Sequence, residues 1–243
     1  MRALILAPHP DDEVLGAGGV IARLAAAGHD VRVAIVTCGQ PPLFDKESVE
    51  RVRSEARKSH AVLGLAPTRF MEGFPAAGLD TVPAHLLNAA LSVEFKEADP
   101  DILFIPFGGV IHSDHQIVFT SALVAARPGQ GTAIRTILAY ETLSETNWYA
   151  PPITPGFIPN AWVDISQYLE KKIAAFETYE SQVKTFPHER SSEAIRALAR
   201  FRGATVGVEA AEAFMVIRQV VTDLRTVALN NLLDTTSEKN PAA

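Results

Sequence analysis

Short apolar runs alternate with amphipathic stretches of helical length along the first 140 residues of the chain. The apolar runs have the length of strands and cover residues 3–7, 31–37, 68–71, 102–106 and 136–140. The amphipathic stretches between them cover residues 14–27, 48–63, 83–97 and 115–126. Strands that alternate with helices of this size form βαβ units. The pattern therefore predicts an α/β fold with a mainly parallel sheet and helices on both faces.

The pattern changes near residue 147. The next segment, up to residue 159, is rich in proline and aromatic residues and is typical of an ordered loop. Beyond it we expect strands at 161–163 and 213–217 and helices at 166–179 and 191–202. Nothing divides the chain into two parts, so residues 1–218 are predicted to form one domain. Residues 219–243 are a C-terminal extension, which could form a helix at 220–233 before a loose tail.

Composition narrows the class of protein. Apolar residues make up 47% of the chain and charged residues 21%, as in an ordinary globular protein. The formal net charge of -6 argues against nucleic acid or an anionic membrane as a partner, because both select basic surfaces. The one cysteine, Cys38, excludes an intrachain disulfide. It is expected to be a small buried packing residue, and a free thiol near a site is the alternative. No apolar run approaches the roughly 20 residues that span a bilayer, and the strand-like start leaves no room for a signal peptide, so we expect a cytoplasmic protein.

The most distinctive chemistry follows the first predicted strand, where His9, Asp11 and Asp12 stand close together. In an open α/β sheet, the carboxyl end of a strand is where ligands bind. His9 and Asp12 are separated by one turn and can converge on one point, whereas Asp11 must point elsewhere. An imidazole and a carboxylate suit a divalent ion such as zinc, but a stable site needs at least one more ligand.

A second cluster follows the predicted strand at 102–106 and contains His112, Asp114 and His115. Its histidines supply candidates for the missing ligand, and Asp114 could orient one imidazole through the second ring nitrogen. The carboxyl ends of parallel strands lie at one edge of a sheet, so the two clusters together predict a metal site. Three protein ligands would leave a position open for water, which is typical of catalytic rather than structural sites.

Other interpretations of these segments stay open. Asp11 or Asp12 could cap the first predicted helix. Ser113 or Asp114 could cap the helix that follows the second cluster in the same way. The glycine-rich segment 16–19 could belong to a nucleotide-binding module, although it does not match G-x-G-x-x-G and the nearby carboxylates would repel a pyrophosphate. We expect these glycines to let the first helix pack closely on the sheet.

Both clusters belong to longer motifs. The first reads His9-Pro10-Asp11-Asp12-Glu13 and is followed by Leu15-Gly16-Ala17-Gly18-Gly19, and the second reads His112-x-Asp114-His115. Further motifs stand at 53–56, 63–64, 78–80, 140–142 and 211–214. In their order and spacing these motifs resemble the LmbE/PIG-L family of zinc-dependent deacetylases, and the resemblance covers most of the chain up to about residue 218. Ser113 replaces a proline that many members have, and Val110 stands where some members carry a tyrosine or an acidic residue.

The resemblance implies a Rossmann-like single domain that removes N-acetyl groups from sugars, usually units of the N-acetylglucosamine type. It implies three zinc ligands, His9, Asp12 and His115, although another divalent metal could take the place of zinc. It implies Asp11 as the general base and His112 as an electrophile or acid near the scissile carbonyl. Asp114 is then a supporting partner of a ligand.

Contacts with the substrate are expected from Arg53, Asp80 and Glu141, although Arg53 could equally be a surface charge. His188 lies in a loop-like segment and is expected to be exposed or part of a lid. We therefore predict a zinc-dependent hydrolase that uses a metal-activated water to remove the N-acetyl group of an N-acetylglucosamine-type sugar or glycoconjugate. The alternatives are a related zinc amidase that cleaves another amide, of the thiol-conjugate type, and a non-catalytic nucleotide-binding module. Relatives in this family are often homo-oligomers, so the resemblance also implies self-association.

Overall fold

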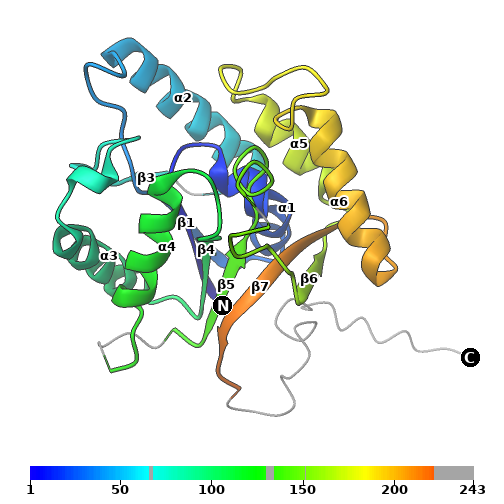
Figure 1. Cartoon of the computed structure of the whole chain (residues 1–243). Helices are drawn as coiled ribbons and strands as arrows, with labels where there is room; N and C mark the ends of the chain where they lie inside the picture. The colour runs from blue at the N-terminus through cyan, green and yellow to red at the C-terminus, as the bar shows by residue number, and fades with distance from the viewer. Residues whose placement is uncertain (66–67, 130–133, 151, 222–243) are drawn as a thin grey trace, which may run out of the picture.

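The computed structural model describes residues 1–65, 68–129, 134–150 and 152–221 (Figure 1). Within these residues the strands form one sheet in the order β3-β2-β1-β4-β5-β7-β6. The strands are β1 (Arg2–Ala7), β2 (Asp30–Ile35), β3 (Arg69–Phe70), β4 (Ile102–Pro106), β5 (Thr136–Tyr140), β6 (Ala161–Asp164) and β7 (Ala211–Gln219). The helices are α1 (Asp12–Ala26), α2 (Lys46–Leu63), α3 (Ala84–Ala98), α4 (Ser113–Ala125), α5 (Leu169–Glu177) and α6 (Ser192–Val206), with a short 3-10 turn at Leu79–Thr81.

The sheet is mixed but mainly parallel. Strands β1 to β5 run parallel to one another, whereas β7 is antiparallel to both β5 and β6. The parallel strands that the alternating pattern predicted are thus confirmed. The chain passes from β1 to β2 and β3 on one side and to β4 and β5 on the other. At such a switch point the loops that follow the two central strands diverge and leave a crevice. Both predicted clusters follow these two strands, β1 and β4.

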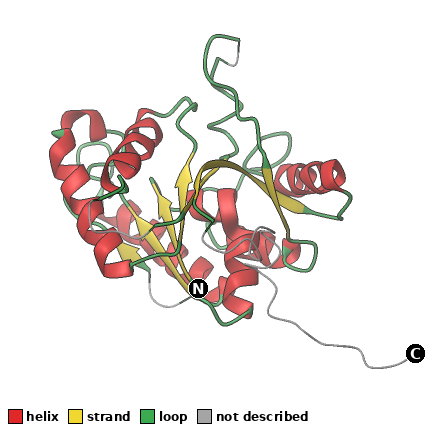
Figure 2. Ribbon diagram, turned by 90° about the horizontal axis from the view of Figure 1, so that it is seen from below, coloured by secondary structure: helices red, strands yellow, loops and turns green. Residues whose placement is uncertain are grey.

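Helices cover both faces of the sheet (Figures 1 and 2). Successive side chains of a strand point to opposite faces, so Leu4 and Leu6 of β1 belong to the core under α3 and α4. Ile5 belongs to the core under α1, α2, α5 and α6. Because the central strands are buried on both faces, they read in the sequence as continuous apolar runs rather than as alternating ones.

Helix α1 is interrupted at Ala17, whose φ of -142° and ψ of 16° are not helical. The backbone groups freed at the break bind side chains from other elements. Glu212 of β7 accepts hydrogen bonds from the N–H groups of residues 19 and 20, at 2.9 and 2.7 Å. Lys172 of α5 donates to the carbonyl oxygen of Leu15 at 2.9 Å and to Glu212 at 2.6 Å. A buried ion pair therefore caps both sides of the break.

The glycines around this break pack closely, as predicted. A Cβ atom on Gly16 would lie 2.1 Å from the ring of Tyr140, and one on Gly19 would lie 2.7 Å from Ile165. All of residues 16–19 are buried. The segment offers no open loop to a pyrophosphate, so the dinucleotide-binding interpretation of these glycines is wrong.

Some helix bounds differ from the prediction for local reasons. β4 and β5 match their predicted ranges residue for residue. Helix α2 begins two residues earlier than predicted, because the carboxylate of Asp45 caps it by accepting an N–H of the first turn at 2.7 Å. Helix α5 is shorter than predicted, because Asp164 binds both the N–H and the hydroxyl of Ser166 in a turn that precedes the helix.

At the C-terminal end, β7 reaches Gln219, one residue past the predicted end of the domain. Residues 222–233 of the helix expected at 220–233 lie outside the described residues. Among the helices that the structure describes, none combines the length and the apolarity that crossing a membrane requires.

Candidate active site

Three side chains converge at the switch point with the geometry of a metal site. Nδ1 of His9, Oδ2 of Asp12 and Nε2 of His115 are separated by 3.1 to 3.4 Å. A tetrahedral ion with bonds of about 2.0–2.1 Å holds its ligand atoms roughly 3.3–3.4 Å apart. Two imidazoles and one carboxylate also form a ligand set that catalytic zinc sites use. The residues therefore fit a divalent ion in both spacing and chemistry.

Asp114 holds His9 in the orientation that such a site needs. Its Oδ2 lies 3.0 Å from Nε2 of His9, and the backbone N–H groups of Ala77 and Leu79 donate to its carboxylate at 2.7 and 3.1 Å. The proton of His9 is thus directed to Nε2, which leaves the lone pair of Nδ1 facing the cluster. With its oxygens engaged in this way, Asp114 supports a ligand and does not need to act as one.

The electrostatics of the cluster favour positive charge. Burial opposes the charge on His9, but hydrogen bonds to Asp114 and Asp12 outweigh it and raise the pKa of His9 to about 10. Burial likewise opposes the charge on Asp12, but His115 and His9 together hold the pKa of this carboxyl well below its usual range. His9 therefore retains its proton beside these carboxylates. A divalent ion would displace this proton, so metal binding should release protons.

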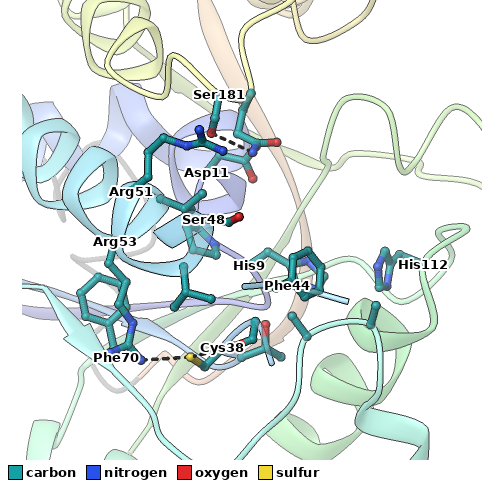
Figure 3. A pocket seen from close by; sticks show the side chains of 18 of the residues that line it. His9, Asp11, Cys38, Phe44, Ser48, Arg51, Arg53, Phe70, His112 and Ser181 are labelled. Atoms are coloured by element: carbon teal, nitrogen blue, oxygen red, sulfur yellow. Dashed lines mark hydrogen bonds between the residues drawn. The ribbon is translucent and has the colours of Figure 1, made fainter. Parts of the chain in front are cut away.

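Asp11 lies beside this triangle and lines a cavity (Figure 3). Its backbone is left-handed, with φ of 103°, and its side chain makes no capping hydrogen bond to α1. Burial raises the pKa of its carboxyl well above the usual range, against the opposing effect of Arg190. Asp11 therefore stands at the N-cap position of α1 without capping the helix through its side chain, and its carboxylate lies at the cavity.

His112 lies next to His9, with the centres of the two rings 4.6 Å apart (Figure 3). Its Nδ1 accepts the N–H of Asp114 at 3.1 Å and so caps α4. The alternative in which Ser113 or Asp114 caps this helix is therefore wrong. Burial and the neighbouring His9 lower the pKa of His112. A neutral imidazole that accepts at Nδ1 carries its proton on Nε2, so His112 can offer an N–H donor to the cavity.

The cavity beside these residues has a volume of about 460 Å³. His9, Asp11 and His112 line it at the carboxyl ends of β1 and β4. Arg53 and Phe70 line the side remote from His112, where the guanidinium lies 4.9 Å from the centre of the ring (Figure 3). The site thus combines a candidate metal centre, a carboxylate beside it and space for a ligand of sugar size.

Comparisons with known proteins agree with this geometry. Residues 4–126 match the family model described as PIG-L, GlcNAc-PI de-N-acetylase. The chain belongs to the PIG-L family. A diacetylchitobiose deacetylase of Thermococcus kodakarensis is 27% identical over 224 residues, which cover 87% of this chain and 81% of that protein. A 1D-myo-inositol 2-acetamido-2-deoxy-alpha-D-glucopyranoside deacetylase of Mycobacteroides abscessus is 27% identical over 227 residues, which cover 75% of this chain and 81% of that protein.

Solved structures share the fold. A conserved protein of Thermus thermophilus superimposes with a TM-score of 0.72 at 28% identity, covering 92% of this chain and 98% of that one. A 4-carboxy-2-hydroxymuconate hydratase of Pseudomonas putida reaches a TM-score of 0.70 at 19% identity, covering 92% of this chain and 99% of that one. The second likeness concerns the fold alone, and it shows that the fold also occurs in an enzyme of another reaction class.

The residues that we expected to contact substrate in this PIG-L protein are not all at the cavity. Arg53 lines it, and its Nη2 lies 2.8 Å from Glu72 and 3.2 Å from the sulfur of Cys38. Asp80 is exposed and is not among the lining residues. The turn that carries it contributes through its backbone, because the N–H groups of residues 77 and 79 hold Asp114.

Glu141, which we also expected to contact substrate, does not line the cavity. Its carboxylate pairs with Arg202 of α6 at 2.8 and 2.6 Å, away from the cavity. Glu145, four residues further on, lines the cavity instead, and burial raises its pKa. Cys38 also lines the cavity and is partly exposed, which agrees with the alternative of a free thiol near a site rather than with a buried packing residue. Val110 is fully buried, and its carbonyl oxygen accepts from Gln116 at 2.7 Å.

Sequence reasoning missed two groups of residues that support Asp11. Glu13 is fully buried and accepts the backbone N–H of Asp11 at 3.2 Å. The same carboxylate accepts the hydroxyl of Tyr179 at 2.5 Å and Nε2 of His60 at 3.1 Å. Glu13 therefore anchors the left-handed turn that presents Asp11 to the cavity. Arg190 is the second group and lies 3.3 Å from the Asp11 carboxylate. Glu13 stands two positions from Asp11 in the chain, whereas no local spacing in the sequence relates Arg190 to Asp11.

Proposed function

We propose that this protein is a zinc-dependent N-deacetylase that acts on an N-acetylglucosamine-type sugar or glycoconjugate. The observation that carries the proposal is the triangle of ligand atoms from His9, Asp12 and His115, which adjoins the carboxylate of Asp11 at a cavity of about 460 Å³. The deacetylase names of relatives that align over most of the chain support the same reaction.

His9, Asp12 and His115 would hold the ion. When bound there, a divalent ion supplies Lewis acidity that polarises the amide carbonyl and makes water a stronger nucleophile at neutral pH. Asp114 keeps Nδ1 of His9 directed at the ion by accepting the proton of Nε2.

Asp11 and His112 then carry out the proton transfers and the charge stabilisation. Asp11 takes a proton from the water as its oxygen bonds to the carbonyl carbon. The N–H on Nε2 of His112 donates to the oxygen on which negative charge develops. As the carbon–nitrogen bond breaks, Asp11 returns the proton to the departing nitrogen. The products are acetate and a free amino sugar, and Asp11 is again a carboxylate.

The test is acetate release from N-acetylglucosamine and diacetylchitobiose by purified protein. Activity should disappear with a chelator and return with Zn²⁺. Asp11→Asn should lower kcat by about 10²–10⁴-fold and retain metal, because the base contributes to proton transfer and is not a ligand. His115→Ala should lose metal as well as activity.

The matched control is Asp80→Asn, which makes the same chemical change at an exposed position outside the cavity and should keep full activity. Chelator-resistant acetate release would refute the metal mechanism. Acetate release from neither sugar, with another amide cleaved instead, would favour the related zinc amidase. Cytoplasmic location and self-association stay predictions from the sequence.

A further inference from the structure

The loop between α5 and α6 brings Arg190 into the candidate active site. Its side chain is 21% exposed and makes four hydrogen bonds or ion pairs. Nη1 lies 3.3 Å from Oδ2 of Asp11 and 3.0 Å from Oε1 of Gln182. Nε donates to the hydroxyl of Ser144 at 2.7 Å, and Nη2 lies 3.5 Å from Glu145. Counted over the described residues, these contacts use four of the five N–H donors of the guanidinium.

The guanidinium is held by groups other than Asp11. The neighbouring Glu189 accepts the backbone N–H of Ser144 at 2.6 Å and the side-chain amide of Asn147 at 3.2 Å. Ser144 has a left-handed backbone, with φ of 66°, and this conformation turns its N–H and hydroxyl toward the α5–α6 loop. Nδ1 of His188 accepts the N–H of Arg190 at 3.0 Å. The loop therefore delivers a positioned guanidinium.

Asp11 needs such a partner. It is 2% exposed and is followed directly by two more buried carboxylates, Asp12 and Glu13, which repel its charge. Within the described ranges, Arg190 donates the only hydrogen bond that reaches the Asp11 carboxylate. Glu13 anchors the backbone of Asp11 through a hydrogen bond to its N–H. Within the described residues, no hydrogen bond besides that of Arg190 fixes the orientation of the Asp11 side chain.

We propose that Arg190 is a positioning residue that fixes the carboxylate of Asp11 for proton transfer. The inference rests on the proposed function, since it concerns the general base of that reaction. A displacement of a reacting group by about 1 Å can cost roughly 10²-fold in rate. Because Arg190 acts through Asp11, its loss should lower kcat and leave KM and metal content nearly unchanged.

The experiment compares Arg190→Gln, Arg190→Lys and Arg190→Ala with Arg196→Gln, which alters a partly exposed arginine of α6 that pairs with Glu170. In Arg190→Gln we expect kcat to fall by roughly 10²-fold with KM within about twofold of the parent value. Arg190→Lys should recover only part of this loss, because an ammonium keeps the charge but not the planar fork. Added guanidinium ion should raise kcat of Arg190→Ala, and Arg196→Gln should behave as the parent protein.

Crystal structures of the parent protein and of Arg190→Gln give a readout that does not need turnover. We expect the Asp11 carboxylate to move or become disordered while His9, Asp12 and His115 stay in place. An unmoved Asp11 overturns the inference, and so does a variant that raises KM with kcat unchanged, because that pattern indicates a contact with substrate. If the parent protein releases no acetate, the proposed function fails, and the structures alone decide whether Arg190 positions Asp11.

Discussion

The buried ion pair between Lys172 and Glu212 predicts a large loss of stability on a small chemical change. The two side chains are 5% and 3% exposed. Oε1 of Glu212 accepts from Lys172 and from the N–H of Gly19, and Oε2 accepts from the N–H of Val20. In Glu212→Gln an NH₂ group replaces either Oε1 or Oε2, and at both positions it faces an N–H donor instead of an acceptor. The change also leaves the ammonium of Lys172 buried without its counter-charge.

Removing one partner of a buried pair costs about 3–5 kcal/mol, and we expect Glu212→Gln to lose this much free energy of unfolding. The matched control is Glu170→Gln on the pair of Glu170 with Arg196. That pair has the same separation of 2.6 Å, but its carboxylate side chain is 70% exposed. Solvent screens such a pair, so the control should lose less than about 1 kcal/mol. Since the distances are equal, the difference between the variants measures the effect of burial.

The assay is urea unfolding of the metal-free proteins at one pH, followed by circular dichroism, with the slopes compared to verify that each variant unfolds in the same way. The reasoning is refuted if Glu212→Gln loses no more free energy of unfolding than Glu170→Gln does. The break in α1 would then be stable without the buried charge that caps it.

Gly16→Ala should lose about 1–3 kcal/mol in the same assay, because the added Cβ would overlap the ring of Tyr140, whereas Gly156→Ala, which has open space around it, should change stability by less than about 0.5 kcal/mol. A bulky maleimide on Cys38, the single cysteine and a cavity residue, should block acetate release, and bound substrate should slow the labelling seen by mass spectrometry. Tyr179→Phe should lose about 1.5–3 kcal/mol on unfolding, because it removes a 2.5 Å hydrogen bond to a buried carboxylate.

Each of these expectations has its own contrary result. Equal stabilities for the two alanine variants would mean that α1 can shift away from the sheet. Fully labelled protein that keeps its activity would place the substrate away from Cys38, and Cys38→Ser treated with the same reagent is the control for reaction elsewhere. An unchanged unfolding midpoint for Tyr179→Phe would mean that the carboxylate finds another donor.

The fold and the candidate metal ligands could be predicted because their signals are local or follow a topological rule. Strands buried on both faces are continuous apolar runs, so β4 and β5 were predicted residue for residue. His9 and Asp12 are related by a single turn of the chain. His115 is brought to them by the parallel pairing of β1 with β4. The alternation of strands and helices predicted that these strands run parallel, and the structure shows that they are neighbours.

The rest of the site depends on the path of loops. Glu141 and Glu145 both follow β5, and nothing in their spacing indicates that Glu141 pairs with Arg202 while Glu145 reaches the cavity. Asp80 was expected at the site, yet only the backbone of its turn contributes. These outcomes depend on contacts between segments far apart in the chain, which short-range patterns do not encode.

By itself the sequence determined the α/β class and predicted the edge of the sheet at which His9, Asp12 and His115 meet. Only the tertiary structure decided what holds the side chain of Asp11 in place. The neighbouring Glu13 anchors the backbone of Asp11, but the carboxylate is held by Arg190, a residue 179 positions away in the chain. The physical reason is that a buried carboxylate needs donors from any direction in space, and packing of distant elements, rather than neighbourhood in sequence, decides which donors arrive.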